Sequence, residues 1–118
     1  MENYIPSPIN WVREQVELYE SSGGTSGTTL LDTGLPCILI THVGNKTGAI
    51  RKTPLMRVKA NDGYVLVGSN GGDINDPVWV YNLRKNKNIQ LRDKENVLSL
   101  RVREIIERQE RDVLWHLS

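Results

Sequence analysis

The sequence predicts a mainly β domain of the α+β class, a small antiparallel barrel with flanking helices. Short apolar or alternating segments follow one another through the middle of the chain, and turn residues such as Asp62-Gly63 separate them. One short helical segment crosses between them. Sequential hairpins around a single crossing helix favour a small barrel over a doubly wound parallel sheet. At 118 residues and 38% hydrophobic content, the chain is expected to form one compact domain.

The first expected element is an amphipathic helix near the amino terminus. Ser7 and Pro8 resemble an N-cap and a first-turn proline. Apolar residues then recur at helical spacing up to about residue 20: Trp11, Val12, Val16 and Tyr19. Residues 21–29 are rich in Gly, Ser and Thr and are interpreted as a flexible linker. The predicted division is residues 1–29, the helix and linker, and residues 30–118, a single barrel domain that ends in a helix.

The role of this helix has two interpretations. It either packs on the domain or acts as a mobile element at a membrane surface or over a substrate site. Its polar side carries more acidic than basic residues. Because basic polar faces are typical of membrane-surface helices, the packed alternative is favoured.

Five strands are expected after the linker. Residues 36–43 form an apolar run that indicates burial on both faces. A half-buried strand and its hairpin partner are expected from the alternating residues Met56, Val58 and Ala60, the turn Asn61-Asp62-Gly63, and the returning segment 64–67. Two further strands are expected at 88–93 and 96–103, with inward faces marked by Ile89, Leu91, Leu98, Leu100 and Val102.

Two more helices are expected. A segment from Val78 to Asn86 can form two helical turns after Asp76-Pro77, and a polar loop at 70–77 precedes it. Residues 104–117 are predicted to form a helix that ends the domain. On the shorter helix, Trp79 and Leu83 have the i, i+4 spacing of core residues. Trp79 could equally line a pocket for an aromatic ligand, and it could be a core residue and a pocket residue at once.

The charge distribution points to an anionic ligand. Residues 44–59 carry five cations, and no Asp or Glu occurs between Asp32 and Asp62, although the net charge is only +1. Gly44 and Gly48 enclose Asn-Lys-Thr directly after an expected strand, so backbone N–H groups there can face an oxyanion. The segment lacks the Walker A order of residues. The alternative is an ordinary solvated turn.

Other classes of function are disfavoured by composition. Nucleic-acid binding is not expected, because the basic residues Arg84, Lys85, Lys87 and Arg92 are balanced by nearby acids and lack interleaved aromatics. Cys37 is the only cysteine and is expected to be a buried core thiol. His42 and His116 are isolated, so no metal site is predicted. The amino terminus has no signal-peptide pattern and no segment is apolar enough for a membrane span, which predicts a cytoplasmic protein.

Two sequence blocks resemble a known family. Residues 44–58, Gly-Asn-Lys-Thr-Gly-Ala-Ile-Arg-Lys-Thr-Pro-Leu-Met-Arg-Val, and residues 76–83, Asp-Pro-Val-Trp-Val-Tyr-Asn-Leu, together resemble the deazaflavin-dependent nitroreductase family of split β-barrel quinone and nitro-compound reductases. The resemblance covers roughly residues 35–103. It implies a split barrel similar to FMN-binding barrels, and the 5-deazaflavin coenzyme F-420, whose phosphodiester and polyglutamate tail would be the anion. FMN is the alternative cofactor.

The resemblance also implies a set of site residues. Asn45, Lys46 and Thr47 would hold the coenzyme's phosphate and tail, with Arg51 and Lys52 adding charge-assisted hydrogen bonds. The remaining cofactor-binding residues implied are Thr53, Pro54, Leu55, Met56, Val67, Gly68, Ser69, Asn70, Val78, Trp79, Val80, Tyr81 and Asn82. Ser69 is the catalytic candidate, because its hydroxyl would polarise a developing oxyanion on the substrate.

The implied activity is hydride transfer from reduced F-420 to a quinone, nitro compound or similar electron-poor acceptor. The alternative is a non-catalytic carrier of a flavin or deazaflavin. Family members usually continue beyond the position equivalent to residue 118 with tyrosines that cover the substrate site, so coenzyme binding is better supported than catalytic competence. A homodimer and peripheral contact of the amino-terminal helix with the inner face of the cell membrane are further expectations.

Overall fold

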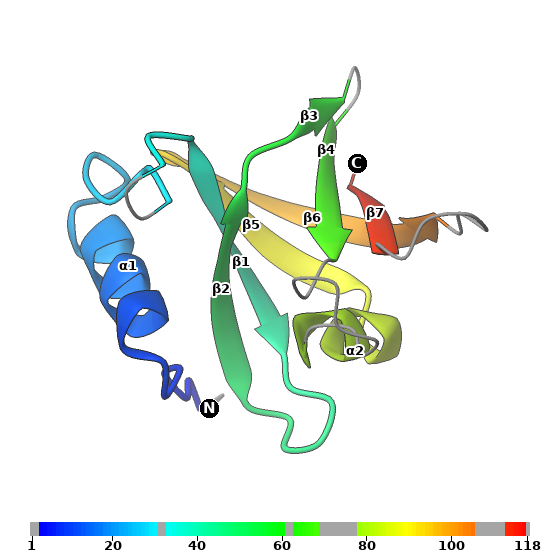
Figure 1. Ribbon diagram of the computed structural model, residues 1–118. Helices are drawn as coiled ribbons and strands as arrows, with labels where there is room; N and C mark the ends of the chain where they lie inside the picture. Colours follow the sequence, from blue (N-terminus) through cyan, green and yellow to red (C-terminus); the bar gives the residue numbers. More distant parts are fainter. Residues whose placement is uncertain (1–2, 31–32, 61–62, 69–77, 106–112, 118) are drawn as a thin grey trace.

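The computed structural model describes residues 3–30, 33–60, 63–68, 78–105 and 113–117. Their elements in chain order are α1 (Asn10–Ser21), β1 (Cys37–Val43), β2 (Ile50–Met56), β3 (Lys59–Ala60), β4 (Gly63–Gly68), α2 (Val78–Lys85), β5 (Asn88–Asp93), β6 (Asn96–Ile105) and β7 (Val113–Leu117). Strands predominate and the two helices lie at the flanks (Figure 1). The predicted class, mainly β with flanking helices, is therefore confirmed.

All neighbouring strands pair antiparallel, in the order β2-β1-β5-β6-β7-β4-β3. The long strand β6 is shared between two halves of the sheet. Its residues 96–101 pair with β5, and its residues 102–105 pair with β7. The sheet therefore turns along β6 and wraps around the core without closing, as a split barrel does (Figure 1).

Strand β1 is buried on both faces, as its apolar run predicted. Ile38 and Ile40 belong to the main core inside the barrel. Cys37 and Leu39 point the other way and pack with Val16 and Tyr19 of α1. Successive side chains of a strand alternate between faces, so this one strand joins the barrel core to the helix that covers it.

The main core fills the space between the sheet halves and α2. Its buried members are Ile38, Ile40, Tyr64, Leu66, Trp79, Val80, Leu83, Ile89, Leu91, Val102 and Trp115. Trp79 is 7% exposed and Leu83 is fully buried, which confirms their predicted role as core residues of the short helix. The predicted inward positions of Ile89, Leu91 and Val102 are confirmed as well.

Two details of the predicted strands were wrong. Met56 is 48% exposed and ends β2 instead of starting an inward-facing strand. The bounds of β2 follow its pairing with β1, which runs from Val43 opposite Ile50 to Cys37 opposite Met56, and not the local alternation. Leu98 is 38% exposed and is not part of the buried core, although its partner across the β5–β6 ladder, Leu91, is.

The predicted carboxyl-terminal helix over 104–117 is also wrong. Glu104 belongs to β6, and residues 113–117 form strand β7. Strand β7 lies between β4 and β6 and pairs with both, while Trp115 is completely buried in the main core. Pairing two strand edges and burying this indole outweigh the helix propensity of the segment.

The Gly and Ser segment after α1 is packed against the domain. The φ angle of Gly24 is +87°, and a Cβ atom there would stand 1.9 Å from the carbonyl oxygen of Lys94. Ser26 donates its backbone N–H to Ser22 Oγ at 2.9 Å, and the Gln15 amide donates to the Thr29 carbonyl at 3.0 Å. The segment thus forms turns held on the barrel, in contrast to the loose tether expected from composition.

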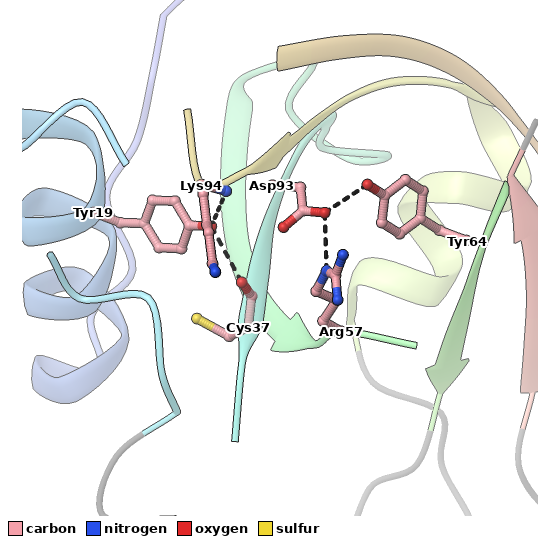
Figure 2. Close-up of polar contacts among 6 residues, drawn as sticks. All are labelled: Tyr19, Cys37, Arg57, Tyr64, Asp93 and Lys94. Carbon is pink, nitrogen blue, oxygen red and sulfur yellow. Dashed lines mark hydrogen bonds and ion pairs between the residues drawn. The ribbon is translucent and has the colours of Figure 1, made fainter. Parts of the chain in front are cut away.

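A buried acid ties the β3–β4 hairpin to the end of β5. Asp93 is 6% exposed, and its Oδ2 accepts hydrogen bonds from the Tyr64 hydroxyl at 2.6 Å and from Arg57 Nε at 2.9 Å (Figure 2). Burial by itself would raise the pKa of Asp93, but the hydrogen bonds from Tyr64 and Arg57 outweigh it, and this pKa is lowered. Burial and the bond to Asp93 raise the pKa of Tyr64 to about 12.

On the other side of β1, Tyr19 makes a second link. Its hydroxyl donates to the Cys37 carbonyl at 3.2 Å and accepts from the Lys94 backbone N–H at 2.6 Å (Figure 2). Helix α1 is therefore fixed to both β1 and the β5–β6 turn.

The variant Tyr64→Phe should lower the free energy of unfolding by about 2 kcal/mol, because a hydrogen bond to a buried carboxylate is lost. Urea unfolding followed by circular dichroism measures this change. Tyr81→Phe is the matched control: Tyr81 is 39% exposed, and in the described residues its hydroxyl has no hydrogen-bond partner. Its effect should stay within about 0.5 kcal/mol. Equal losses in both variants would contradict the assignment of Asp93 as the partner that matters.

Candidate functional site

A cleft of about 550 Å³ lies between the start of α1, strands β1 and β2, the turn that joins them, and α2. We call it the main cleft. It is lined by Ser7, Pro8, Ile9, Val12, His42, Gly44, Asn45, Lys46, Thr47, Arg51, Lys52, Thr53, Val78, Trp79 and Asn82. Its volume is in the range of pockets that hold a small organic ligand.

Many of the residues singled out from the sequence meet in this cleft. They are Asn45, Lys46, Thr47, Arg51, Lys52, Thr53, Val78, Trp79 and Asn82. They come from two blocks that are far apart in the sequence, the β1–β2 hairpin and α2. The fold therefore brings both blocks to one place, although the ligand they hold stays a prediction.

The other predicted site residues that the structure describes do not line the main cleft. Val80 is fully buried in the core, and Pro54 is buried within β2. Exposed side chains elsewhere are those of Met56, Val67 and Tyr81. Leu55 packs against the main core, and Gly68 ends β4. Ser69 and Asn70 lie outside the described residues.

Sequence reasoning missed two contributions to the cleft. Ser7, Pro8 and Ile9 line it from the amino-terminal side, and the Ser7-Pro8 pair had been considered only as a helix start. His42 was considered only as a metal ligand and excluded as one, and it also lines the cleft. The alternation of β1 offered a signal, since His42 shares the inward parity of Ile38 and Ile40.

The cations of the basic segment divide into paired and unpaired groups. Lys52 Nζ lies 2.7 Å from Glu20 Oε2 of α1, and Arg57 Nε lies 2.9 Å from Asp93 Oδ2. In the part of the chain that the structure describes, the side chains of Lys46 and Arg51 have no acidic or hydrogen-bonding partner. The charge available to an anion in the main cleft therefore comes from these two residues.

The β1–β2 turn is closed by its glycines. The Gly44 N–H donates to the Ala49 carbonyl at 2.7 Å, and the Gly48 N–H donates to the Gly44 carbonyl at 2.9 Å. The φ angle of Gly48 is +72°, in the left-handed region that glycine adopts without strain.

This closure leaves donors free at the tip. Among the described residues, the backbone N–H groups of Lys46 and Thr47 have no hydrogen-bond partner. Thr47 Oγ1 accepts from the Ala49 N–H at 3.1 Å, so its own proton is also available. The tip of the turn thus offers backbone and hydroxyl donors beside the Lys46 ammonium, an arrangement suited to an oxyanion.

Helix α2 holds this turn through a buried amide. Asn82 is 2% exposed, and its Oδ1 accepts the Asn45 backbone N–H at 2.8 Å. Its Nδ2 lies 3.1 Å from His42 Nδ1, and His42 Nε2 lies 2.9 Å from Thr53 Oγ1. Burial, with a smaller effect of Arg51, lowers the pKa of His42 from 6.5 to about 4. The imidazole is therefore neutral at physiological pH.

A second hollow of about 420 Å³ lies beside the same turn. It is lined by Val43, Gly44, Asn45, Lys46, Thr47, Gly48, Lys85 and Asn86. Lys85 Nζ donates to the Asn45 carbonyl at 3.0 Å. Because Gly44 to Thr47 line both hollows, the turn separates them and faces each one.

In the described residues, no group of three or more His, Cys, Asp or Glu side chains is arranged to hold a metal ion. No helix among them is long and apolar enough to cross a membrane.

The pKa of His42 is lower in the folded protein than in the unfolded one. As the pH falls from 6.5 toward 4, the imidazole therefore gains a proton only in the unfolded state. His42 should therefore cost the fold about 3 kcal/mol of stability between pH 7 and pH 4. Urea unfolding across this range measures it, and His42→Gln should remove that part of the slope. His116, the other histidine, provides the control variant His116→Gln. An unchanged slope in His42→Gln would contradict a neutral buried imidazole.

Comparison with known sequences identifies relatives over most of the chain. A family model described as F420H(2)-dependent quinone reductase matches residues 11–118. The F420H(2)-dependent quinone reductases MT1299 and Rv1261c, from two strains of Mycobacterium tuberculosis, are each 33% identical over 84 residues. The match covers 70% of this chain and 55% of each relative, so the chain spans about half the length of the curated relatives it matches.

Solved structures share the fold. An F420-H2 dependent reductase, FDR-A, superposes with a TM-score of 0.62 at 26% identity, covering 70% of this chain and 94% of that one. A structure described as a domain-swapped dimer superposes with a TM-score of 0.64 at 31% identity, covering 95% of this chain and all of that one. With the family model spanning residues 11–118 and these structures sharing its fold, the chain belongs to the F420H(2)-dependent quinone reductase family.

Proposed function

We propose that this chain binds coenzyme F-420 in the main cleft and transfers a hydride from its reduced form to a quinone or a similar electron-poor acceptor. Family membership supports the choice of coenzyme and acceptor. The single structural observation that carries the proposal is the composition of the main cleft. It joins the free donors of the β1–β2 turn to an apolar wall on α2.

The turn fits the anionic part of such a coenzyme. The free N–H groups of Lys46 and Thr47 would donate to phosphate oxygens, and the Lys46 ammonium and Arg51 guanidinium would balance the charge. Lys52 would contribute less than the sequence suggested, because Glu20 already holds its ammonium.

The opposite part of the cleft fits a flat ring system. Trp79 and Val78 of α2 and Ile9 from the amino-terminal side supply apolar surface, and Thr53 of β2 lines the cleft as well. When bound, the reduced coenzyme supplies a hydride that, with one proton, converts a quinone to a hydroquinone. The residues of this chain would orient the two reactants and keep water from the reacting atoms.

The remaining predicted contacts stay part of the proposal. Pro54, Leu55, Met56, Val67 and Gly68 would approach the ring through the backbone, with Asn70 and Tyr81 completing the pocket. Val80, which is buried in the core, would support the pocket from behind. Ser69 would donate its hydroxyl to the oxyanion that develops on the acceptor.

The proposal is tested first by binding. Titration of the protein with oxidised F-420 and, separately, with FMN, followed by ligand fluorescence, should show micromolar or tighter binding of F-420 and weaker binding of FMN. Anaerobic oxidation of reduced F-420 should then be faster with protein and menadione than with menadione alone. Absence of F-420 binding would overturn the proposal. Binding without acceleration would identify a carrier in place of an enzyme.

Charge variants locate the bound anion. Lys46→Gln and Arg51→Gln should each weaken F-420 binding by about tenfold and reduce its dependence on salt, since each removes a charge-assisted hydrogen bond. Lys94→Gln removes the same charge at the β5–β6 turn, at the other end of β1, and should change affinity by less than about twofold. Equal effects of all three variants would show that only net charge matters.

Pairing of two copies and contact with a membrane also belong to this proposal. The neighbour described as a domain-swapped dimer supports pairing, and sedimentation velocity should show a dimer. Exposed apolar side chains on the amino-terminal segment, Ile5, Ile9, Trp11 and Leu18, support peripheral membrane contact. Flotation with lipid vesicles should recover the protein, and Trp11→Ser should recover less. A monomer, or no flotation, would refute the respective part.

A further inference from the structure

The floor of the main cleft contains a buried chain of polar groups that joins three elements. Asn82 comes from α2, His42 from β1 and Thr53 from β2. His42 is 3% exposed and Asn82 is 2% exposed. Buried polar groups must be paired, so their donor and acceptor roles are constrained by one another.

The direction of the hydrogen bonds from Asn82 to Thr53 is fixed at one end by a backbone amide. The Asn45 N–H can only donate, so the atom of Asn82 that faces it, 2.8 Å away, must be the carbonyl oxygen Oδ1. The amide nitrogen of Asn82 therefore faces His42 Nδ1 at 3.1 Å and donates to it. An imidazole nitrogen that accepts a hydrogen bond carries no proton.

The tautomer of His42 follows. Burial keeps the ring neutral, so its single proton lies on Nε2, and Nε2 donates to Thr53 Oγ1 at 2.9 Å. Thr53 Oγ1 thus accepts the hydrogen bond from His42. Its own hydroxyl proton has no other partner among the described residues, and Thr53 lines the main cleft. A hydroxyl whose lone pair is occupied in this way presents its proton to the cleft.

We infer that His42 and Asn82 are positioning residues that aim the Thr53 hydroxyl proton into the main cleft, where it donates to an acceptor atom, such as a carbonyl oxygen, on the bound ring system. This inference rests on the proposed function for the identity of the ligand. The site therefore selects a ring with an acceptor at this point and disfavours one with a donor there, since two donors would face each other.

The internal half of the inference is tested without ligand. In protein labelled with ¹⁵N at histidine, long-range proton–nitrogen spectra distinguish a protonated ring nitrogen from a bare one. The chain has two histidines, so His116→Gln assigns the His42 signals. We expect a protonated Nε2 and a bare Nδ1. In Asn82→Asp the side chain has no N–H to donate, and Nδ1 should gain a proton. A protonated Nδ1 in the wild type would overturn the inference.

The ligand half is tested by titration with oxidised F-420. Thr53→Val keeps the shape of the side chain but removes the hydroxyl, and it should weaken binding about tenfold, because the ring acceptor loses its donor. Thr53→Ser retains the hydroxyl and should bind within about threefold of the wild type. Thermal unfolding of both variants controls for folding.

The outcomes separate this inference from the proposed function. Tight binding by the wild type and equally tight binding by Thr53→Val would overturn the inference and leave the proposed function standing. No binding of F-420 by the wild type would overturn the proposed function together with the ligand half. The histidine spectrum would then still decide whether the polar chain runs from Asn82 to Thr53.

Discussion

The burial of β1 on both faces is the constraint on which the rest of the structure depends. Its odd-numbered residues Cys37 and Leu39 hold α1, and its even-numbered residues Ile38 and Ile40 fill the barrel. It also pairs along both edges, with β2 and with β5. A slip of one residue would exchange the two apolar faces and would carry His42 away from α2. The register of this strand therefore determines both which of its residues enter the core and which line the main cleft.

Buried polar groups lie near each end of β1. At the Cys37 end, Asp93 joins the β3–β4 hairpin to β5, and at the Val43 end, Asn82 joins α2 to the β1–β2 turn. Burying such groups costs free energy unless every partner is present, so packings that separate the partners are disfavoured. The two sets differ in charge: Asp93 is ionised and faces Arg57, whereas His42 is neutral.

The sequence predicted what local pattern and burial decide. The strand at 36–43, the helix beginning at Val78 and the hairpin around Asp62-Gly63 follow from periodicity and turn chemistry, and the structure contains each of them. The carboxyl-terminal segment was predicted incorrectly because its strand exists only through pairing with β4 and β6. The same limit applies to the site.

In the site, acidic residues distant in sequence determine which cations of the basic segment remain unpaired, and the local sequence pattern does not show this. The basic segment 44–59 reads as uniformly cationic, yet Lys52 and Arg57 are matched by acids from other elements. No local pattern reveals that Glu20 lies beside Lys52, 32 positions away in the chain. Likewise, the amino-terminal wall of the cleft depends on how α1 packs. The sequence identified both blocks that line the cleft. The ion pairs made by their cations became visible only in the folded structure.

Helix α2 makes the proposed anion end and the proposed ring end of the cleft parts of one unit. Asn82 lies three residues after Trp79 and so projects from the same side of the helix. Because Asn82 also accepts the Asn45 N–H, any shift of α2 would move the turn and the apolar wall together. A turn held only by its own hydrogen bonds could place an anion but could not fix its distance from the ring. With a net charge of only +1, the chain cannot rely on a broad field to attract its ligand. If the proposed site is correct, selectivity would then come from this fixed spacing between a few free donors and Trp79.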